Sequence, residues 1–326
     1  MTVQLTVIGC GRLGASVGLA LAGETAQLTR VAHDPQPERA RAAEKMGAFD
    51  KVILNLHNAV EDADIVLLAL PLAQARQTLE TIAPTLKLGC LVLDTSPARA
   101  EMLDAAARLL PAGRHFVTFT PTLNPTVLME TGQDQTSASP DLFKRSQVFL
   151  SGAPGTEGEA VKLAYDLALL LGARPFFADP YETDGLWSAT HLLPQMAAAA
   201  LMDAATGQPG WNDARRIAGA EFALASSPLL FMDASQPADA PWAQRQNLAR
   251  LLDDYLASLR DLRLALAAES PQPLADWLAR ALTARETWLN QRQAADFDPK
   301  FSESEIPTTA EFLRRLVGIR PKKKKP

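Results

Sequence analysis

The feature that most constrains this chain is a strand, a glycine-rich turn and a helix that follow one another within its first 22 residues. Residues 3–8, VQLTVI, place apolar side chains as a short buried strand does. Gly9, Gly11 and Gly14 follow in a G-x-G-x-x-G spacing, and residues 15–22 carry small and apolar side chains at helical intervals. The first glycine permits a tight turn, the second lets a phosphate approach the backbone, and the third lets the helix pack closely on the strand. Because the start of the helix presents N–H groups and a positive dipole end, the pattern predicts a pyrophosphate site.

A carboxylate at the end of the next predicted strand specifies the ligand further. Residues 28–32 are typical of a second strand, and Asp34 follows it, 20 residues after Gly14. A carboxylate at this place accepts hydrogen bonds from the hydroxyls of an adenosine ribose and repels a 2′-phosphate. Together the two signals predict a nicotinamide dinucleotide site that prefers NAD, while the nearby Arg30, Arg39 and Arg41 leave NADP possible. A glycine-rich turn without a ligand is the alternative.

Strands and helices alternate up to about residue 180. The predicted strands are residues 3–8, 28–32, 51–54, 65–70, 91–93, 115–119, 147–151 and 175–178. This alternation predicts an α/β Rossmann-type doubly wound parallel sheet, whose ligands bind beyond the carboxyl ends of the strands. The residues that we expect at the cofactor on this edge are Gly9, Gly11, Arg12, Leu13, Gly14, Asp34, Leu70, Pro71 and Asp94.

The second half of the chain is predicted to be all helical. The expected helices are residues 181–205, 213–225, 246–268, 274–289 and 308–317, and Pro194 should kink or locally break the first. In the third helix, apolar side chains step by four and three residues, which forms a heptad seam of Leu248, Leu252, Tyr255, Leu259, Leu262 and Leu266. Such a seam packs within its own subunit or forms a dimer interface. We therefore expect a dinucleotide-binding domain over residues 1–180, a helical substrate and dimerisation domain over 181–320, and a basic disordered tail over 321–326.

Composition argues against several other classes of protein. The 326 residues carry a net charge of −5, which does not suit a general nucleic-acid binder. Cys10 and Cys90, the two cysteines, form neither a disulfide framework nor a metal cluster. No apolar run reaches the ~18 residues that a membrane helix needs, and the strand begins too soon after Met1 for a signal peptide. We expect a cytoplasmic protein with a small-molecule substrate and without a metal, nucleic-acid or membrane partner.

A proton-handling group is expected on the first helix of the second half. Asp184, Ser188, His191 and Gln195 step by four, three and four residues, which predicts one helix face. Imidazole gives and takes a proton near neutral pH, so His191 is the predicted catalytic residue and the other three are predicted to bind substrate. The alternatives are an interior histidine near a kink and a polar helix face exposed to solvent.

Residues 3–265 resemble, in order, the prephenate/arogenate dehydrogenase family of tyrosine biosynthesis. The similar segments are GCGRLGASVGLAL, AVEDADIVLLALPL, LFKRSQVFLSG, the Leu-Gly-Ala at 171–173, SATHLLPQMAAAAL and Asn247. The resemblance implies a Rossmann domain followed by a helical dimerisation domain. It also implies an oxidative decarboxylation, in which a hydride leaves the carbon that bears the ring hydroxyl, carbon dioxide leaves, and the ring becomes aromatic.

The chain departs from this family's pattern where the resemblance would place the chemistry. The family has D-x-x-S-x-K where this chain has DTSPAR at 94–99, so Pro97 replaces the serine, Ser96 lies beside it, and Arg99 replaces the lysine. Thr120 replaces the catalytic histidine of the family's H-P-x-x-G loop, and the H-D pair becomes Thr183 followed by Asp184. The substrate-binding arginine would fall near residues 223–225, where there is none.

These departures leave three functions open. The first is a prephenate/arogenate-type dehydrogenase with an altered catalytic site formed by His191, Thr120 and Ser96. The second is a dehydrogenase or reductase for a different small carboxylated substrate. The third is a non-catalytic dinucleotide-binding protein.

Overall fold

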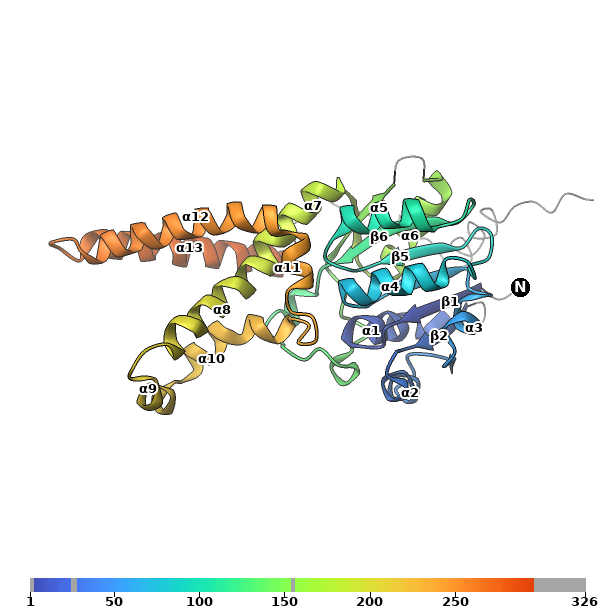
Figure 1. Ribbon diagram of the computed structural model, residues 1–326, viewed down its shortest axis with the longest axis horizontal. Coiled ribbons are helices and arrows are strands. Elements are labelled where there is room, and N and C mark those ends of the chain that lie inside the picture. Colours follow the sequence, from blue (N-terminus) through green and yellow to red (C-terminus); the bar gives the residue numbers. More distant parts are fainter. Residues whose placement is uncertain (1–2, 25–27, 154–155, 296–326) are drawn as a thin grey trace, which may run out of the picture. The chain divides into compact units, whose positions relative to one another are not determined.

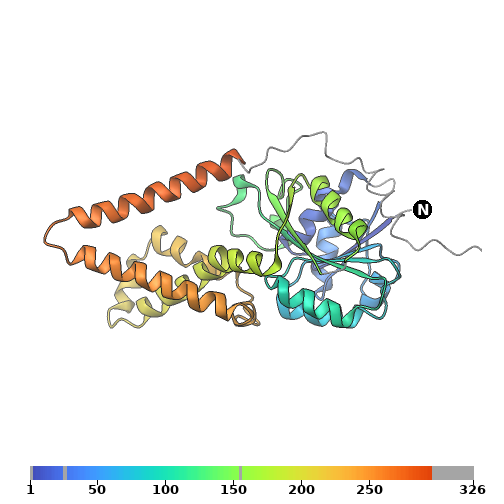
Figure 2. The same ribbon diagram turned by 90° about the horizontal axis from the view of Figure 1, so that it is seen from above.

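The described residues of the computed structural model, 3–24, 28–153 and 156–295, form two compact units that divide between Thr183 and Asp184. The first unit is an α/β unit and the second is helical, as Figures 1 and 2 show. This architecture confirms the predicted fold class. The functional domain boundary expected at residue 180 stays a prediction. Among the described residues, no helix has both the length and the apolar character to cross a membrane.

The first unit is built on an eight-stranded sheet with the order β3-β2-β1-β4-β5-β6-β7-β8. The strands are β1 (Val3–Ile8), β2 (Leu28–His33), β3 (Lys51–Val52), β4 (Ile65–Leu68), β5 (Leu91–Asp94), β6 (His115–Pro121), β7 (Gln147–Gly152) and β8 (Arg174–Phe177). Neighbouring strands are parallel except β6 and β7, which are antiparallel. The sheet is therefore mostly parallel, and the antiparallel pair is a feature that the sequence patterns did not specify.

The connection between β6 and β7 explains the antiparallel pair. A parallel partner requires a crossover that returns the chain to the amino ends of the strands, usually through a helix. Residues 122–146, which we call the β6–β7 segment, contain two short 3₁₀ turns, η2 (Pro125–Val127) and η3 (Gln135–Ser137). The segment therefore starts and ends at the carboxyl end of β6, on the edge where the ligand was predicted.

Helices cover both faces of the sheet. They are α1 (Arg12–Ala20), α2 (Pro37–Lys45), α3 (Leu56–Val60), α4 (Leu72–Ile82), α5 (Arg99–Leu109) and α6 (Gly158–Leu170). The largest core cluster joins apolar side chains of β1, β4, β5 and β6 to α1, α2 and α6. Helices α4 and α5 contact each other on the opposite face (Figure 2). This double covering buries strands such as Ile65–Leu68 completely, which explains their continuous apolar sequence.

The helical half differs from the prediction in detail. Its elements are α7 (Pro180–Trp187), a π turn (Ser188–Leu192), α8 (Leu193–Thr206), α9 (Trp211–Ile217), α10 (Ala220–Ser226), the 3₁₀ helix η5 (Ser227–Phe231), α11 (Asp239–Ala243), α12 (Arg245–Leu266) and α13 (Gln272–Ala294). The helix predicted over 213–225 is wrong as one element, because the backbone leaves the helical conformation at Ala218 and Gly219. The sequence patterns did not predict helix α11. The predicted helix 308–317 and the predicted tail 321–326 lie outside the described residues.

The break predicted at Pro194 is confirmed and takes the form of the π turn. Proline has no N–H to donate to the carbonyl four residues earlier, at Thr190. The α-helix is interrupted by the wider turn at Ser188–Leu192, and α8 resumes with Pro194 in its first turn. Single π turns of this kind occur often at functional sites.

Candidate functional site

The glycine turn between β1 and α1 has no room for larger residues. Gly9 has a φ of +99°, and a Cβ there would lie 2.2 Å from the carbonyl oxygen of Ala69. A Cβ on Gly14 would lie 2.0 Å from the carbonyl oxygen of Gly9. The start of α1 therefore rests directly on the turn. The N–H groups of its first turn, which have no partner within the helix, begin at this edge of the sheet.

Asp34 lies against this turn and is 6% exposed. Its Oδ2 accepts a hydrogen bond from the backbone N–H of Cys10 at 2.7 Å, and its Oδ1 accepts one from that of Gln36 at 2.8 Å. Each carboxylate oxygen has a further lone pair. The side chain therefore holds the turn in shape and keeps the capacity to accept hydrogen bonds from ribose hydroxyls. Burial and, secondly, the charge of Asp34 raise the pKa of the Cys10 thiol, so this cysteine remains neutral beside the proposed phosphate position.

The other predicted cofactor residues lie at the same edge. The backbone N–H of Ala69 donates to the Ile8 carbonyl at 2.8 Å, which places Leu70 and Pro71 beside the glycine turn. Leu70 is buried, and Pro71 is exposed at the start of α4. The ladder continues from Leu68 to its partner Asp94, which ends β5. The structure thus brings the glycine turn, Asp34, Leu70, Pro71 and Asp94 to neighbouring strand ends.

Asp94 and Ser96 form one half of a buried polar cluster. Ser96 Oγ donates to Asp94 Oδ2 at 2.5 Å, and both residues are at most 1% exposed. Burial raises the pKa of Asp94 to about 6, although the hydrogen bonds from Ser96 and the charge of Arg99 act in the opposite direction. A carboxyl group with such a pKa changes its protonation state close to neutral pH.

Arg99 and Thr120 form the other half of this buried polar cluster. Arg99 is fully buried, and its Nε donates to Thr120 Oγ1 at 3.0 Å while Nη1 donates to the Pro97 carbonyl at 3.0 Å. Because its oxygen accepts from Arg99, the Thr120 hydroxyl keeps its own proton for donation. The two positions where the sequence replaces a lysine and a histidine of the family pattern therefore contact each other. Sequence reasoning noted both replacements and missed this pairing.

The strand predicted over residues 115–119 is longer than expected and includes Thr120. Strand β6 continues to Pro121, and Thr120 pairs with Phe149 of β7. The antiparallel partner extends the ladder past the point where the apolar pattern of β6 ends. Thr120 is therefore held by a strand at 2% exposure, which fixes its position more firmly than a loop does.

In the second unit, the four predicted polar residues do not share one environment. Asp184, Ser188 and Gln195 are buried, and Ser188 Oγ donates to the Asp184 carbonyl at 2.7 Å. His191 is exposed within the π turn. The prediction of one common face assumed regular α-helical spacing, and the wider π turn changes the direction of the residues that follow Ser188.

His191 is nevertheless held in a defined orientation. Its ring stacks on the Trp187 ring with centroids 3.6 Å apart and planes 2° apart. Its Nδ1 lies 2.9 Å from the Thr190 hydroxyl. Imidazole is a side chain that can give and take a proton near neutral pH.

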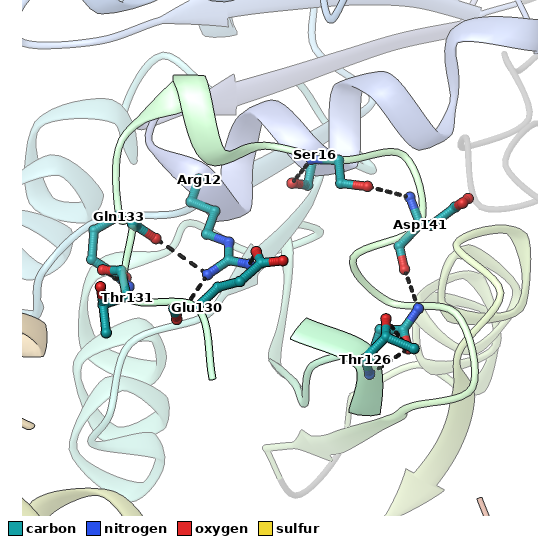
Figure 3. Close-up of polar contacts among 10 residues, drawn as sticks. Arg12, Ser16, Thr126, Glu130, Thr131, Gln133 and Asp141 are labelled. Atoms are coloured by element: carbon teal, nitrogen blue, oxygen red, sulfur yellow. Dashed lines mark hydrogen bonds and ion pairs between the residues drawn. The ribbon is translucent and has the colours of Figure 1, made fainter. Parts of the chain in front are cut away.

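The β6–β7 segment lies across the start of α1, as Figure 3 shows. The backbone N–H of Arg12 donates to the Gln133 carbonyl at 2.9 Å, and the Arg12 guanidinium lies 2.5 Å from Glu130 Oε2. Ser16 Oγ accepts from the backbone N–H of Ser139 at 3.0 Å. Sequence reasoning found no signal for this contact, because the segment has neither strand nor helix periodicity. No cluster of three metal-ligating acidic, histidine or cysteine side chains occurs within the part of the chain that the structure describes.

Comparisons with known proteins agree with this geometry. Residues 17–176 match the family model for the nucleotide-binding domain of prephenate dehydrogenase. The chain is 26% identical to the cyclohexadienyl dehydrogenase of Zymomonas mobilis over 303 residues, covering 87% of this chain and 96% of that protein. It is also 26% identical to the prephenate dehydrogenase of Bacillus subtilis over 206 residues, covering 62% of this chain and 53% of that protein.

Solved structures share the fold. The prephenate dehydrogenase of Aquifex aeolicus in complex with hydroxyphenyl propionate and NAD⁺ aligns with a TM-score of 0.76 at 18% identity, covering 88% of this chain and 99% of that one. The arogenate dehydrogenase of Synechocystis aligns with a TM-score of 0.68 at 20% identity, covering 87% and 99%.

Proposed function

We propose that this chain, of which residues 17–176 match the nucleotide-binding domain of prephenate dehydrogenase, is an NAD-dependent dehydrogenase for a small carboxylated ring substrate of the prephenate or arogenate type. The observation that carries the proposal is the glycine turn locked by Asp34 at the carboxyl edge of the sheet. When bound there, NAD⁺ supplies the hydride acceptor. The residues that would hold it are those of the glycine turn, together with Asp34, Leu70, Pro71 and Asp94.

The preference for NAD over NADP is supported by the charges around Asp34. A 2′-phosphate would meet the Asp34 carboxylate, which is fixed in place by two backbone N–H groups. Arg30, one of the candidates for accommodating that phosphate, is committed elsewhere, because its guanidinium binds Asp50 and the carbonyls of Gly18 and Gly47. Titration with both cofactors tests this preference, and tighter binding of NADP⁺ would overturn it.

The catalytic step must differ from the family pattern. A threonine hydroxyl is not a base at neutral pH, and Thr120 accepts its hydrogen bond from a cationic arginine. We place the removal of the substrate hydroxyl proton on His191, or on a water held by Ser96 and Thr120. Losing a positioned base costs about 10²- to 10⁴-fold in rate. Prephenate turnover is therefore expected to be slow, unless the loss of carbon dioxide supplies most of the driving force.

A substrate panel with two variants tests the altered site. Formation of reduced nicotinamide is followed by absorbance with prephenate, arogenate and related carboxylated acids. We expect His191→Asn to lower kcat on the best substrate and Thr120→His to create or raise prephenate turnover. His57→Asn replaces an exposed histidine that binds Thr85 and serves as the matched control.

The same panel separates the remaining candidates. Unchanged kcat in His191→Asn contradicts the assignment of His191. A best substrate outside the prephenate and arogenate type supports the second function, a dehydrogenase or reductase for another carboxylated molecule. NAD⁺ binding without turnover of any acid supports the third, a non-catalytic dinucleotide-binding protein.

A homodimer through the helical unit completes the proposal. The heptad seam of α12 begins at Leu248, which is 4% exposed, but Tyr255, Leu259 and Leu266 are 38%, 42% and 64% exposed. A second copy of the chain would cover these side chains. Light scattering should give about twice the 35.1 kDa chain mass, and Leu259→Asp should shift the protein toward monomer. A wild-type monomer at micromolar concentration would contradict the dimer. The cytoplasmic location remains part of this proposal.

A further inference from the structure

The first N–H group of helix α1 is already bound within the chain. In a dinucleotide site, the N–H groups at the start of this helix face phosphate oxygens. Here the Arg12 N–H donates to the Gln133 carbonyl oxygen at 2.9 Å. A Cβ on Gly11 would lie 3.2 Å from that same oxygen. The space that Gly11 leaves open for a ligand is thus taken by a carbonyl oxygen, whose partial negative charge resembles that of a phosphate oxygen.

The Arg12 side chain also has the character of an anion-binding group. It is 5% exposed, and its guanidinium contacts Glu130 Oε2 at 2.5 Å and the Gly132 carbonyl at 3.2 Å (Figure 3). Its Nε is buried and has no hydrogen-bond partner among the residues that the structure describes. A buried donor left unsatisfied is destabilising. An incoming phosphate would supply both the missing acceptor and the negative charge that Glu130 now supplies.

Two further contacts attach the same segment beside the glycine turn. The Ser139 N–H donates to Ser16 Oγ, one turn further along α1. The 3₁₀ turn η3 contacts both α1 and α2. A hydrogen bond from Thr136 and, more weakly, the charge of Arg39 on α2 hold the pKa of Asp134 below its usual range, so this carboxylate is ionised. Residues 128–139, which we call the strap, therefore extend over the expected phosphate and ribose positions.

We propose that the strap closes the pyrophosphate position of α1 in the cofactor-free protein, and that it moves aside when the dinucleotide binds. Glu130 binds the Arg12 guanidinium and the Gln133 carbonyl binds the Arg12 N–H until phosphate oxygens replace them. This inference rests on the proposed dinucleotide site. If only a fraction of the molecules has an open strap, the observed association constant for NAD⁺ equals the intrinsic constant multiplied by that fraction.

Calorimetric titration of NAD⁺ into the full chain and the variant Glu130→Gln tests the strap. Removing the charge of Glu130 weakens its interaction with Arg12, which is one of the contacts that hold the strap closed. The variant should therefore bind NAD⁺ about two- to fivefold more tightly. The control is Glu157→Gln. Glu157 is 64% exposed, compared with 56% for Glu130, and lies 3.9 Å from His115 at the opposite end of β6. This control should leave the affinity unchanged.

Hydrogen exchange provides a second measurement on the wild-type protein. Saturating NAD⁺ should accelerate exchange in peptides that cover residues 128–139, because the Ser139 N–H loses its bond to Ser16. Equal or weaker NAD⁺ binding by Glu130→Gln, or slower exchange of the strap, would overturn the inference while leaving the proposed function standing. If neither the wild type nor the variant binds NAD⁺, the proposed function and the strap both fall.

Discussion

Two alanine substitutions in the same helix should separate the packing role of α1 from its role in cofactor binding. A Cβ on Gly14 would lie 2.0 Å from the Gly9 carbonyl oxygen, and one on Gly18 would lie 2.4 Å from the Ala48 carbonyl oxygen. Real Cβ atoms essentially never approach closer than 3.0 Å. In both variants the helix must therefore move away from a rigid backbone atom, by up to about 1 Å in Gly14→Ala.

The expected loss of stability is similar for the two variants. Overpacking of this kind costs about 1–3 kcal/mol. For a unit of this size, each kcal/mol lowers the midpoint of thermal unfolding by about 2–4 °C, so each variant should unfold about 2–12 °C below the wild type. Gly158→Ala, at a position with nothing within 4 Å of the added methyl group, should show no such loss.

The response to NAD⁺ should differ between the two variants. A ligand at 100 times its Kd adds about 2.7 kcal/mol, which raises the midpoint of unfolding by roughly 5–11 °C. Gly18→Ala should keep this rise because its clash lies against Ala48, away from the glycine turn. Gly14→Ala should lose it because its clash displaces the turn itself. Thermal unfolding with and without NAD⁺ measures both effects, and an equal NAD⁺ response in the two variants would refute the reasoning.

Three further substitutions test the charges of the first unit. Burial raises the pKa of Asp94 from 3.8 to about 6, so between these pH values the folded protein holds a proton that the unfolded chain has released. Relative to Asp94→Asn, the wild type should therefore lose on the order of 2 kcal/mol of stability as pH rises from about 4 to 6. Urea unfolding at several pH values measures this difference, and parallel profiles would contradict it. Arg30→Met should lower the free energy of unfolding by about 2–4 kcal/mol in the same assay at neutral pH, because it leaves the Asp50 carboxylate without its guanidinium partner. A loss below about 1 kcal/mol would contradict this prediction. Asp34→Asn should weaken NAD⁺ binding about tenfold in a titration, because an amide cannot accept from both Cys10 and Gln36; unchanged affinity would argue against a ribose site.

Local patterns in the sequence predicted most of the first unit. The strand at Val3–Ile8, the glycine turn and α1 follow from apolar periodicity and from positions that exclude side chains. Periodicity carries no information about strand direction, so the sequence patterns did not specify that β7 is antiparallel to β6. The relevant signal was the lack of a helix pattern in residues 122–146, since a parallel partner requires a crossover.

The candidate site was less predictable because its contacts depend on register and on backbone irregularity. Arg99 contacts Thr120 because the β5–β6 ladder pairs Asp94 with Thr118 and so sets Thr120 just beyond the end of β5. Neither residue indicates the other in the sequence. The position of His191 depended on how the chain accommodates Pro194, and proline predicts an interruption without specifying a π turn.

The antiparallel pairing of β6 and β7 has a consequence for how the chain that covers the cofactor edge of this fold can diversify. The intervening chain leaves and re-enters the sheet through a narrow neck, where the Thr122 N–H donates to the Gln147 carbonyl and the Asn124 N–H to the Leu142 carbonyl, both at 2.7 Å. Residues beyond the neck can be inserted or deleted without shifting any strand. Doubling the length of a flexible loop costs only about 0.6 kcal/mol in closure entropy. Loop length at this edge is therefore a variable that evolution or protein engineering can change while the sheet, and the turn that Asp34 secures, stay the same.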